Sequence, residues 1–120
     1  MPVKTLKEED LQGFIGSENW YQHGLVRTIT FTDGAKYVAD SGGAYWLLDE
    51  IALAQKFIPR VKAEPFQVWK LAVSDNTGVL TCEDGNDNIV FTKEIPFTDF
   101  PLPEIKFYFT DNVILLPSEY

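Results

Sequence analysis

The longest helical pattern in the chain covers residues 42–58. At about 100° per residue, apolar side chains recur on one broad face of this segment, as a helix packed on a sheet requires. The face consists of Ala44, Leu47, Leu48, Ile51, Ala54 and Ile58. Asp40 and Ser41 precede the segment as capping residues, Lys56 lies near its end, and Pro59 stops it. The pattern predicts a central helix.

The same segment carries a second apolar stripe. Trp46, Leu53 and Phe57 project together from nearly the opposite side of the predicted helix. A helix that is apolar on two sides needs cover on both. The second cover is either another molecule or the N-terminal part of the chain, including the aromatic residues Trp20 and Tyr21. Both alternatives stay open, and cover from within the chain is preferred.

The second half of the chain predicts strands. Apolar and polar residues alternate there in five short segments that are separated by turn-forming residues: 66–73, 78–82, 89–95, 105–110 and 113–116. The first three segments predict a meander, and the last two predict a hairpin around Asp111 and Asn112. Residues 96–103 contain three prolines, which lack the donors of a sheet, so we expect a crossing loop there.

The first half predicts a hairpin and a short helix. Residues 27–31 and 35–39 flank an Asp-Gly pair, and a three-residue loop that pairs Phe31 with Ala35 keeps one face apolar. Near the N-terminus, a capping box of Thr5 and Glu8 predicts a helix over residues 6–12. Residues 14–24 follow as an ordered loop.

This order of elements predicts the fold class. We expect one α+β domain over residues 1–120. Its antiparallel sheet, built from a hairpin, a meander and a C-terminal hairpin, packs on one central helix, and a short N-terminal helix precedes the sheet.

Composition agrees with a single folded domain. The chain has 120 residues, of which 45% are hydrophobic and 23% charged. Cys82 is the only cysteine, so no intramolecular disulfide can form and a reducing compartment is the simplest interpretation. The N-terminus lacks the apolar run of a signal peptide, and no stretch approaches the roughly 20 apolar residues of a membrane span. We expect a complete, cytoplasmic protein without a membrane partner.

The formal net charge is −8, and the acidic residues concentrate in the second half. Residues 64–120 hold ten acidic side chains against three lysines. Such a field opposes phosphate backbones and favours basic partners, although solubility is the preferred explanation. The ten basic residues are scattered along the sequence, and the nearest approach to a cluster, Lys56, Arg60 and Lys62, is explained by the end of a helix. We expect no direct binding to nucleic acid.

Candidate chemistry is sparse. Glu18, Trp20, Tyr21 and His23 place a carboxylate, a phenol and the only imidazole within six residues, from which an acid–base pair could be built. No nucleophile or phosphate loop accompanies them, so a structural role is preferred: Trp20 and Tyr21 hold the loop on the helix, and His23 forms a hydrogen bond at its edge.

The remaining motifs exclude most common sites. Cys82 precedes Glu83 and Asp84, whose charge disfavours a reactive thiolate. The acidic turn after Asp84 lacks the glycine and the terminal glutamate of a calcium loop. One histidine and one cysteine do not make a structural zinc site. We expect no catalytic residue, no metal and no cofactor.

Five segments resemble a family of small bacterial and mobile-element proteins that is known only as a domain of unknown function: 42–52, 66–71, 80–86, 97–102 and 115–120. The resemblance begins near Leu11 and spans most of the chain. The family has no assigned activity, so no catalytic residue is transferred from it. It implies an accessory role in the biology of the host or the mobile element.

The main functional hypothesis is a non-enzymatic interaction module. A small acidic domain of this kind would bind a protein partner or itself through exposed aromatic side chains. Trp46 and Phe57 are the candidates on the outer face of the helix, with Trp20 and Tyr21 nearby.

A sharper form of the hypothesis is an acidic inhibitor or decoy of a mobile element. Such a protein would occupy the nucleic-acid groove of a basic partner through Glu83, Asp84 and Asp87. The alternative from another class is a small enzyme or ligand-binding pocket that uses Glu18, Tyr21 and His23.

Overall fold

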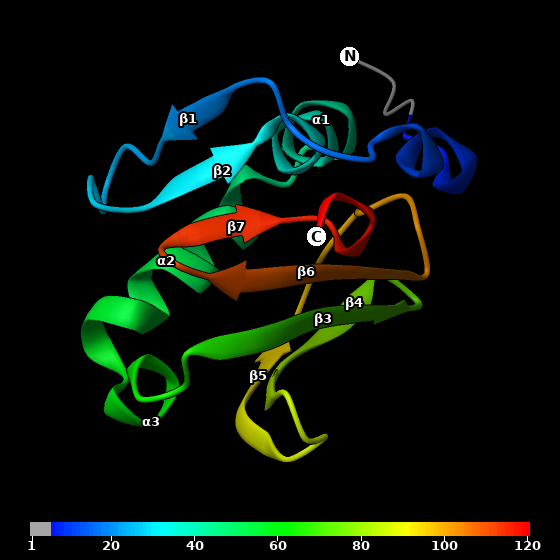
Figure 1. Ribbon diagram of the computed structural model, residues 1–120. Coiled ribbons are helices and arrows are strands. Elements are labelled where there is room, and N and C mark those ends of the chain that lie inside the picture. Colours follow the sequence, from blue (N-terminus) through cyan, green and yellow to red (C-terminus); the bar gives the residue numbers. More distant parts are fainter. Residues whose placement is uncertain (1–5) are drawn as a thin grey trace.

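The computed structural model describes residues 6–120 and shows an α+β protein with a seven-stranded, mostly antiparallel sheet (Figure 1). This confirms the predicted fold class. In chain order the elements are the 3₁₀-helix η1 (Glu8–Gly13), β1 (Trp20–Gln22), β2 (Thr30–Thr32), α1 (Asp33–Gly42), α2 (Tyr45–Phe57), α3 (Pro59–Lys62), β3 (Phe66–Ser74), β4 (Thr77–Asp84), β5 (Ile89–Ile95), β6 (Glu104–Thr110), β7 (Val113–Leu115) and the 3₁₀-helix η2 (Pro117–Glu119).

The strands lie in the order β1-β2-β7-β6-β3-β4-β5, so β1 and β5 form the two edges. β3, β4 and β5 pair antiparallel in succession, and β6 pairs antiparallel with both β3 and β7. β2 and β7 are parallel, with Phe31 opposite Ile114. The expectation of a wholly antiparallel sheet was therefore wrong at this pair, where segments from the two ends of the chain meet.

Two tight turns fix the register of the long strands. Asp75 and Asn76 join β3 to β4, and Asp111 and Asn112 join β6 to β7. All four have positive φ, between 52° and 62°, as two-residue hairpin loops require. Asp and Asn tolerate this left-handed conformation better than most residues, which explains their presence here.

The predicted hairpin over residues 27–39 was wrong, because its second strand is the helix α1. Thr32 is the N-cap, and its hydroxyl accepts a hydrogen bond from the Ala35 amide at 3.3 Å. The Asp-Gly pair forms the first turn of the helix instead of a hairpin loop. Ala35, Val38 and Ala39 recur at helical spacing and are buried. Phe31 pairs with Tyr21 on β1, not with Ala35.

The central helix begins later than its pattern predicted. Gly42 ends α1, and Gly43 is the C-cap of α1 with φ of 62°, a conformation that favours glycine. Asp40 and Ser41 therefore lie within α1 and do not cap α2, which starts at Tyr45. The expected central helix is therefore α2, and α1 occupies the place of the predicted second strand.

The N-terminal predictions also change in detail. The helix expected over residues 6–12 is the 3₁₀-helix η1, and Thr5 of its predicted capping box lies outside the described residues. The loop expected over residues 14–24 contains the short strand β1.

The core lies on one face of the sheet. Trp69 on β3 and Phe107 on β6 are fully buried, as are Leu47, Leu48 and Ile51 on α2. The alternate positions of β3 are more exposed, so helices cover only one side of these strands. The α2 face that the sequence predicted for sheet packing is buried, except for the half-buried Ile58 at its end.

Candidate functional site

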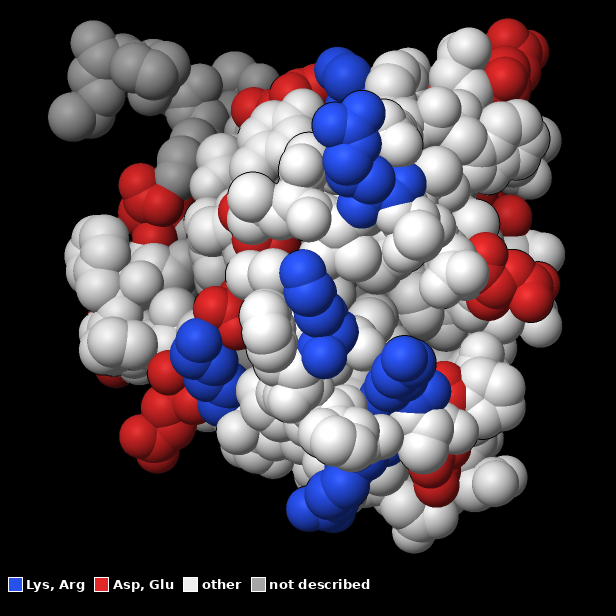
Figure 2. Space-filling view, turned by 90° about the vertical axis from the view of Figure 1, so that its left-hand side faces the viewer, with Lys and Arg blue, Asp and Glu red and all other residues white. Residues whose placement is uncertain are grey.

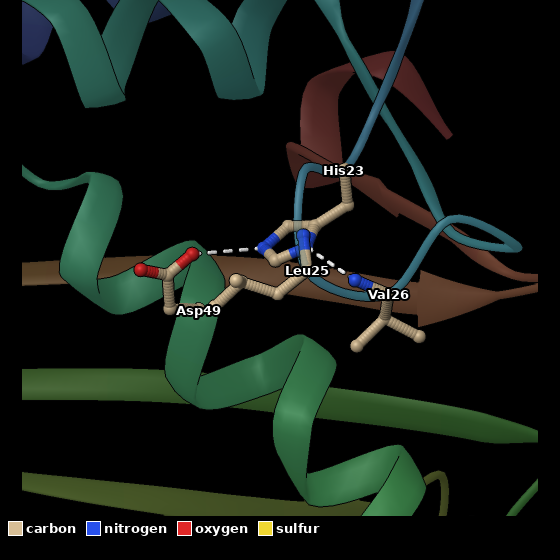
Figure 3. A network of polar contacts seen from close by, with 4 residues as sticks. All are labelled: His23, Leu25, Val26 and Asp49. Atoms are coloured by element: carbon tan, nitrogen blue, oxygen red, sulfur yellow. Dashed lines mark hydrogen bonds and ion pairs between the residues drawn. The ribbon is translucent and has the colours of Figure 1, made fainter.

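His23 lies in the loop between β1 and β2 and is 3% exposed. Its Nδ1 atom accepts hydrogen bonds from the backbone amides of Leu25 and Val26, both at 3.1 Å, and its Nε2 atom lies 2.9 Å from Asp49 Oδ1 on α2 (Figure 3). Because Nδ1 accepts, the proton of the neutral ring is on Nε2 and is donated to Asp49. Both nitrogens are occupied in holding the loop on the helix, as expected for a structural histidine.

Tyr21 belongs to a second loop anchor. Its hydroxyl donates a 2.9 Å hydrogen bond to Asp33, and its ring stacks on Phe31 at 5.7 Å. The backbone amides of Glu18 and Asn19 donate to the other oxygen of Asp33. The Tyr21 hydroxyl, followed by these amides, holds the pKa of Asp33 below its usual range, and the same tyrosine–carboxylate bond raises the pKa of Tyr21.

These residues do not form one catalytic pocket. Glu18 and Tyr21 line an open hollow of about 450 Å³ together with Asp33 and Lys36, but His23 does not line it. In this hollow, the imidazole of the alternative hypothesis does not join the carboxylate and the phenol. Trp20 lies on the edge strand β1 and is 57% exposed.

The second apolar stripe of α2 borders a groove beside β5. Two adjoining hollows of about 430 and 400 Å³ make up this α2–β5 groove. Trp46, Leu53 and Phe57 line it from α2, and Phe91 lines it from β5. Both hollows share Glu50 and Lys93, whose side chains form a 2.7 Å ion pair across the groove. The ion pair divides one apolar channel into two parts.

The groove is open, contrary to the preferred expectation of internal cover. Neither η1 nor the loop of Trp20 and Tyr21 lines its hollows. Trp46 is half-buried against the core, whereas Phe57 is 68% exposed. Trp20 lies at the opposite edge of the sheet, so it does not join Trp46 and Phe57 in one surface. Phe97, in the crossing loop, lines the groove and is also exposed.

The three acidic candidates of the β4–β5 turn, Glu83, Asp84 and Asp87, have different surroundings. Both oxygens of Asp84 are used within the turn: they accept from the backbone of Asn86 and Asn88 and from the Asn88 side chain. These amides hold the pKa of Asp84 below its usual range. Asp87 is exposed at the turn, and Glu83 is half-buried on β4. Asp84 therefore shapes the turn, while Asp87 and Glu83 remain available to a partner.

Cys82 belongs to a buried polar network around Gln67. Burial, reinforced by nearby carboxylates such as Glu64, raises the pKa of the thiol to about 12. Gln67 is fully buried, accepts from Trp69 Nε1 at 2.9 Å, and donates to the carbonyls of Val61 and Glu64. The network ties the end of α3 to the sheet, and the raised pKa disfavours the thiolate form of Cys82.

Within residues 6–120, no group of three or more His, Cys, Asp or Glu side chains is arranged to hold a metal ion. Over the same residues, no helix has the length and hydropathy that crossing a membrane requires.

Comparison with protein-family models finds one match, over residues 5–120: a family of unknown function, DUF6876. The chain belongs to this family. Neither the curated proteins nor the solved structures contain a match. Membership in DUF6876 confirms the expected domain of unknown function and assigns no activity.

The α2 side of the groove follows from the sequence pattern, but its other wall does not. Phe91 lies in the strand predicted over residues 89–95, and Phe97 lies in the crossing loop predicted over residues 96–103. The available signal was the row of apolar residues from β5 into the loop: Ile89, Val90, Phe91, Ile95 and Phe97. The sheet order places β5 at an edge, and the lining of the two hollows places Phe91, Ile95 and Phe97 beside α2.

Proposed function

We propose that this member of DUF6876 is a non-enzymatic protein-interaction module whose contact surface is the α2–β5 groove. One observation carries the proposal: the second apolar stripe of α2 borders an open groove beside an edge strand, with Phe57 exposed and Trp46 and Leu53 half-buried. β5 pairs only with β4 among the described strands, so its outer backbone groups are free to pair with an added strand.

Added backbone and exposed side chains would act together in this contact. An extended segment next to β5 directs alternate side chains toward α2, where the two hollows lie on either side of the Glu50–Lys93 pair. Backbone pairing supplies affinity, and the hollows supply specificity. Trp46 and Phe57 are the aromatic anchors of the contact, a role that interface centres favour for such residues.

The test compares two pairs of substitutions. Trp46→Ala with Phe57→Ala removes apolar surface from the groove, and Trp20→Ala with Ile15→Ala removes exposed apolar surface elsewhere. Affinity capture from the native host, quantified by mass spectrometry, identifies partners, and sedimentation velocity at rising concentration measures self-association. We expect the groove pair to lose the partner or the self-association by about tenfold or more, and the control pair to retain it. Unchanged capture and self-association in the groove pair would refute the proposal.

The gathering of acidic residues around β4 and β5 favours a second candidate function, the acidic decoy. Glu83, Asp87 and Glu94 lie on β4, the β4–β5 turn and β5, and Lys93 is the basic residue of that turn and strand. In this version, a mobile-element protein presents these acids to a basic, nucleic-acid-binding partner. Reversing all three acids to Lys is expected to abolish binding that is strongly weakened by salt. Capture that does not respond to moderate ionic strength would exclude the decoy and leave the groove proposal standing.

A further inference from the structure

A second surface lies where α2 and α3 end. A hollow of about 740 Å³ is lined there by Arg27, Lys56 and Lys62, with Arg60 on the same short helix as Lys62. Figure 2 looks onto this side of the molecule and shows basic side chains spread over it, with acidic ones mainly toward the margins. We call this surface the basic hollow.

The cations of the basic hollow come from separate parts of the chain. Lys56 is in the last turn of α2 and Lys62 is in α3, where basic residues interact favourably with the carbonyl end of a helix. Arg27 comes from the loop between β1 and β2, so the helix ends do not account for it. The fold therefore gathers basic residues that appear scattered in the sequence.

These cations lack carboxylate partners within the described part of the chain. The ion pairs there involve His23, Lys36, Lys70 and Lys93. Arg27 contacts the Gln22 side chain at 3.5 Å, and the Lys56 ammonium lies 5.7 Å from the centre of the Phe57 ring. Although the chain has 18 acidic residues, these basic groups remain free to pair with an external anion.

The lining of the basic hollow indicates which kind of anion fits. Two carboxylates, Glu64 and Asp111, lie among the cations. Their charge repels any anion, but a phosphate backbone offers them only hydrogen-bond acceptors, whereas a peptide also offers N–H donors that can pair with them. The remaining lining includes the apolar residues Val26, Ile29 and Phe109, which suit an apolar side chain.

We propose that the basic hollow binds a short acidic segment of a partner protein. Carboxylates of the segment pair with Arg27, Lys56 and Lys62, its N–H groups donate to Glu64 and Asp111, and an apolar side chain packs on the floor. Lys56 and Phe57 are neighbours on α2 but line different hollows, so this site is separate from the α2–β5 groove.

The experiment uses a fluorescein-labelled peptide of alternating glutamate and leucine as the probe. Fluorescence anisotropy measures its binding to the full chain at low and moderate salt. The same peptide with lysine in place of glutamate tests the sign of the charge, and an oligothymidylate of equal charge tests for phosphate. We expect the glutamate peptide to bind more tightly than both, with weaker binding as salt rises.

Matched charge reversals locate the site. Arg27→Glu with Lys62→Glu is expected to weaken binding by about tenfold. Lys7→Glu with Lys106→Glu makes the same change of charge at two exposed lysines outside the hollow and is expected to change affinity by less than about twofold. Circular dichroism confirms that each variant is folded.

Four results would overturn the proposal: absence of peptide binding, an equal loss in both pairs of reversals, tighter binding of the oligothymidylate, or loss of peptide binding in the single variant Trp46→Ala, which leaves the Lys56–Phe57 contact in place. The last result would place the peptide in the α2–β5 groove. Retained peptide binding in that variant, together with lost partner capture, supports both surfaces independently.

Discussion

At the scale of single residues, Asp33 links the N-terminal loop to the start of α1 and makes stability depend on pH. Its folded-state pKa is lowered, first by the Tyr21 hydroxyl and then by the Glu18 and Asn19 amides. A lowered folded pKa stabilises the protein above the unfolded pKa, and this contribution is lost as pH falls through the folded value. Protonation of Asp33 in acid therefore weakens the loop anchor.

We predict that Asp33→Asn lowers the urea midpoint at pH 7 and that its difference from the wild type narrows between about pH 5 and pH 2. Chemical unfolding at several pH values measures the difference. Asp75→Asn, in an exposed turn, removes the same charge and serves as the control. Its urea midpoint is expected to stay close to that of the wild type at every pH. A gap for Asp33→Asn that stays constant over this range would contradict the prediction.

Gln67 is a buried residue whose side-chain amide makes several hydrogen bonds, so replacing it would leave several buried groups without a partner. Its amide joins Gln55, Trp69 and the carbonyls of Val61 and Glu64 inside the protein. Leucine fills a similar volume but leaves these groups without their partner, so Gln67→Leu is predicted to destabilise the protein by about 3 kcal/mol. Urea unfolding with an unchanged m-value is the measurement. A loss below about 1 kcal/mol would mean that water or a rearranged Gln55 replaces the amide.

At the scale of elements, α1 depends on the C-terminal segment. Glu119 accepts hydrogen bonds from the Thr32 hydroxyl at 2.6 Å, the Gly34 amide at 3.0 Å and the Leu116 amide at 2.9 Å. A carboxylate there satisfies free amides and complements the positive end of the helix. A side chain at position 34 would crowd the Glu119 carboxylate, so glycine lets this carboxylate approach the first turn closely.

We therefore predict that Glu119→Ala lowers the free energy of unfolding by about 1–2 kcal/mol. Glu119→Gln is expected to recover only part of the loss, because its NH₂ group cannot accept from an amide. Ser118→Ala, on the same 3₁₀-helix, is the matched control and is expected to cost little. Equal effects of the alanine changes at 118 and 119 would contradict a specific cap.

The elements that the sequence predicted are those that local pattern determines. β3 to β7 lie close to the five predicted strands, because turns of Asp and Asn separate β3 from β4, β4 from β5 and β6 from β7. The segment from Asp33 to Gly42 was wrong because Asp-Gly is also a hairpin signal. Its helical spacing is carried by small residues, Ala35, Val38 and Ala39. Thr32 caps the first turn of α1, and Glu119 accepts a hydrogen bond from its Gly34 amide. Because Glu119 is distant in sequence, the local pattern does not reveal its contribution to the helix.

The sequence predicted only the part of the α2–β5 groove that belongs to one helix. Trp46 and Phe57 emerged from the helical period of α2, whereas β5 as the opposite wall depends on sheet order. The basic hollow shows the same limit. Arg27 joins Lys56 and Lys62 only through the packing of the β1–β2 loop beside the helix ends, which no local spacing encodes.

At the scale of the whole molecule, charge is segregated although the net charge is −8. Arg27, Lys56 and Lys62 line the basic hollow together with two of the 18 acidic residues, and acidic residues outnumber basic ones in the rest of the chain. Repulsion among like charges opposes the compact state, while the same field orients charged partners during approach. Stability and recognition therefore both depend on ionic strength. Because the charges are segregated, added salt is expected to raise the free energy of unfolding and to weaken binding to the basic hollow.

We predict that raising NaCl from about 10 mM to about 100 mM increases the urea midpoint, because the Debye length falls from about 30 Å to about 10 Å and acidic repulsion is screened. The combined variant Glu83→Gln, Asp87→Asn removes two acids near the β4–β5 turn and is expected to show a smaller increase. Over the same salt range, anisotropy of the glutamate–leucine peptide is expected to report weaker binding to the basic hollow. Parallel loss of stability and binding would instead indicate that salt unfolds the protein, and would contradict the opposite dependence that segregated charge requires.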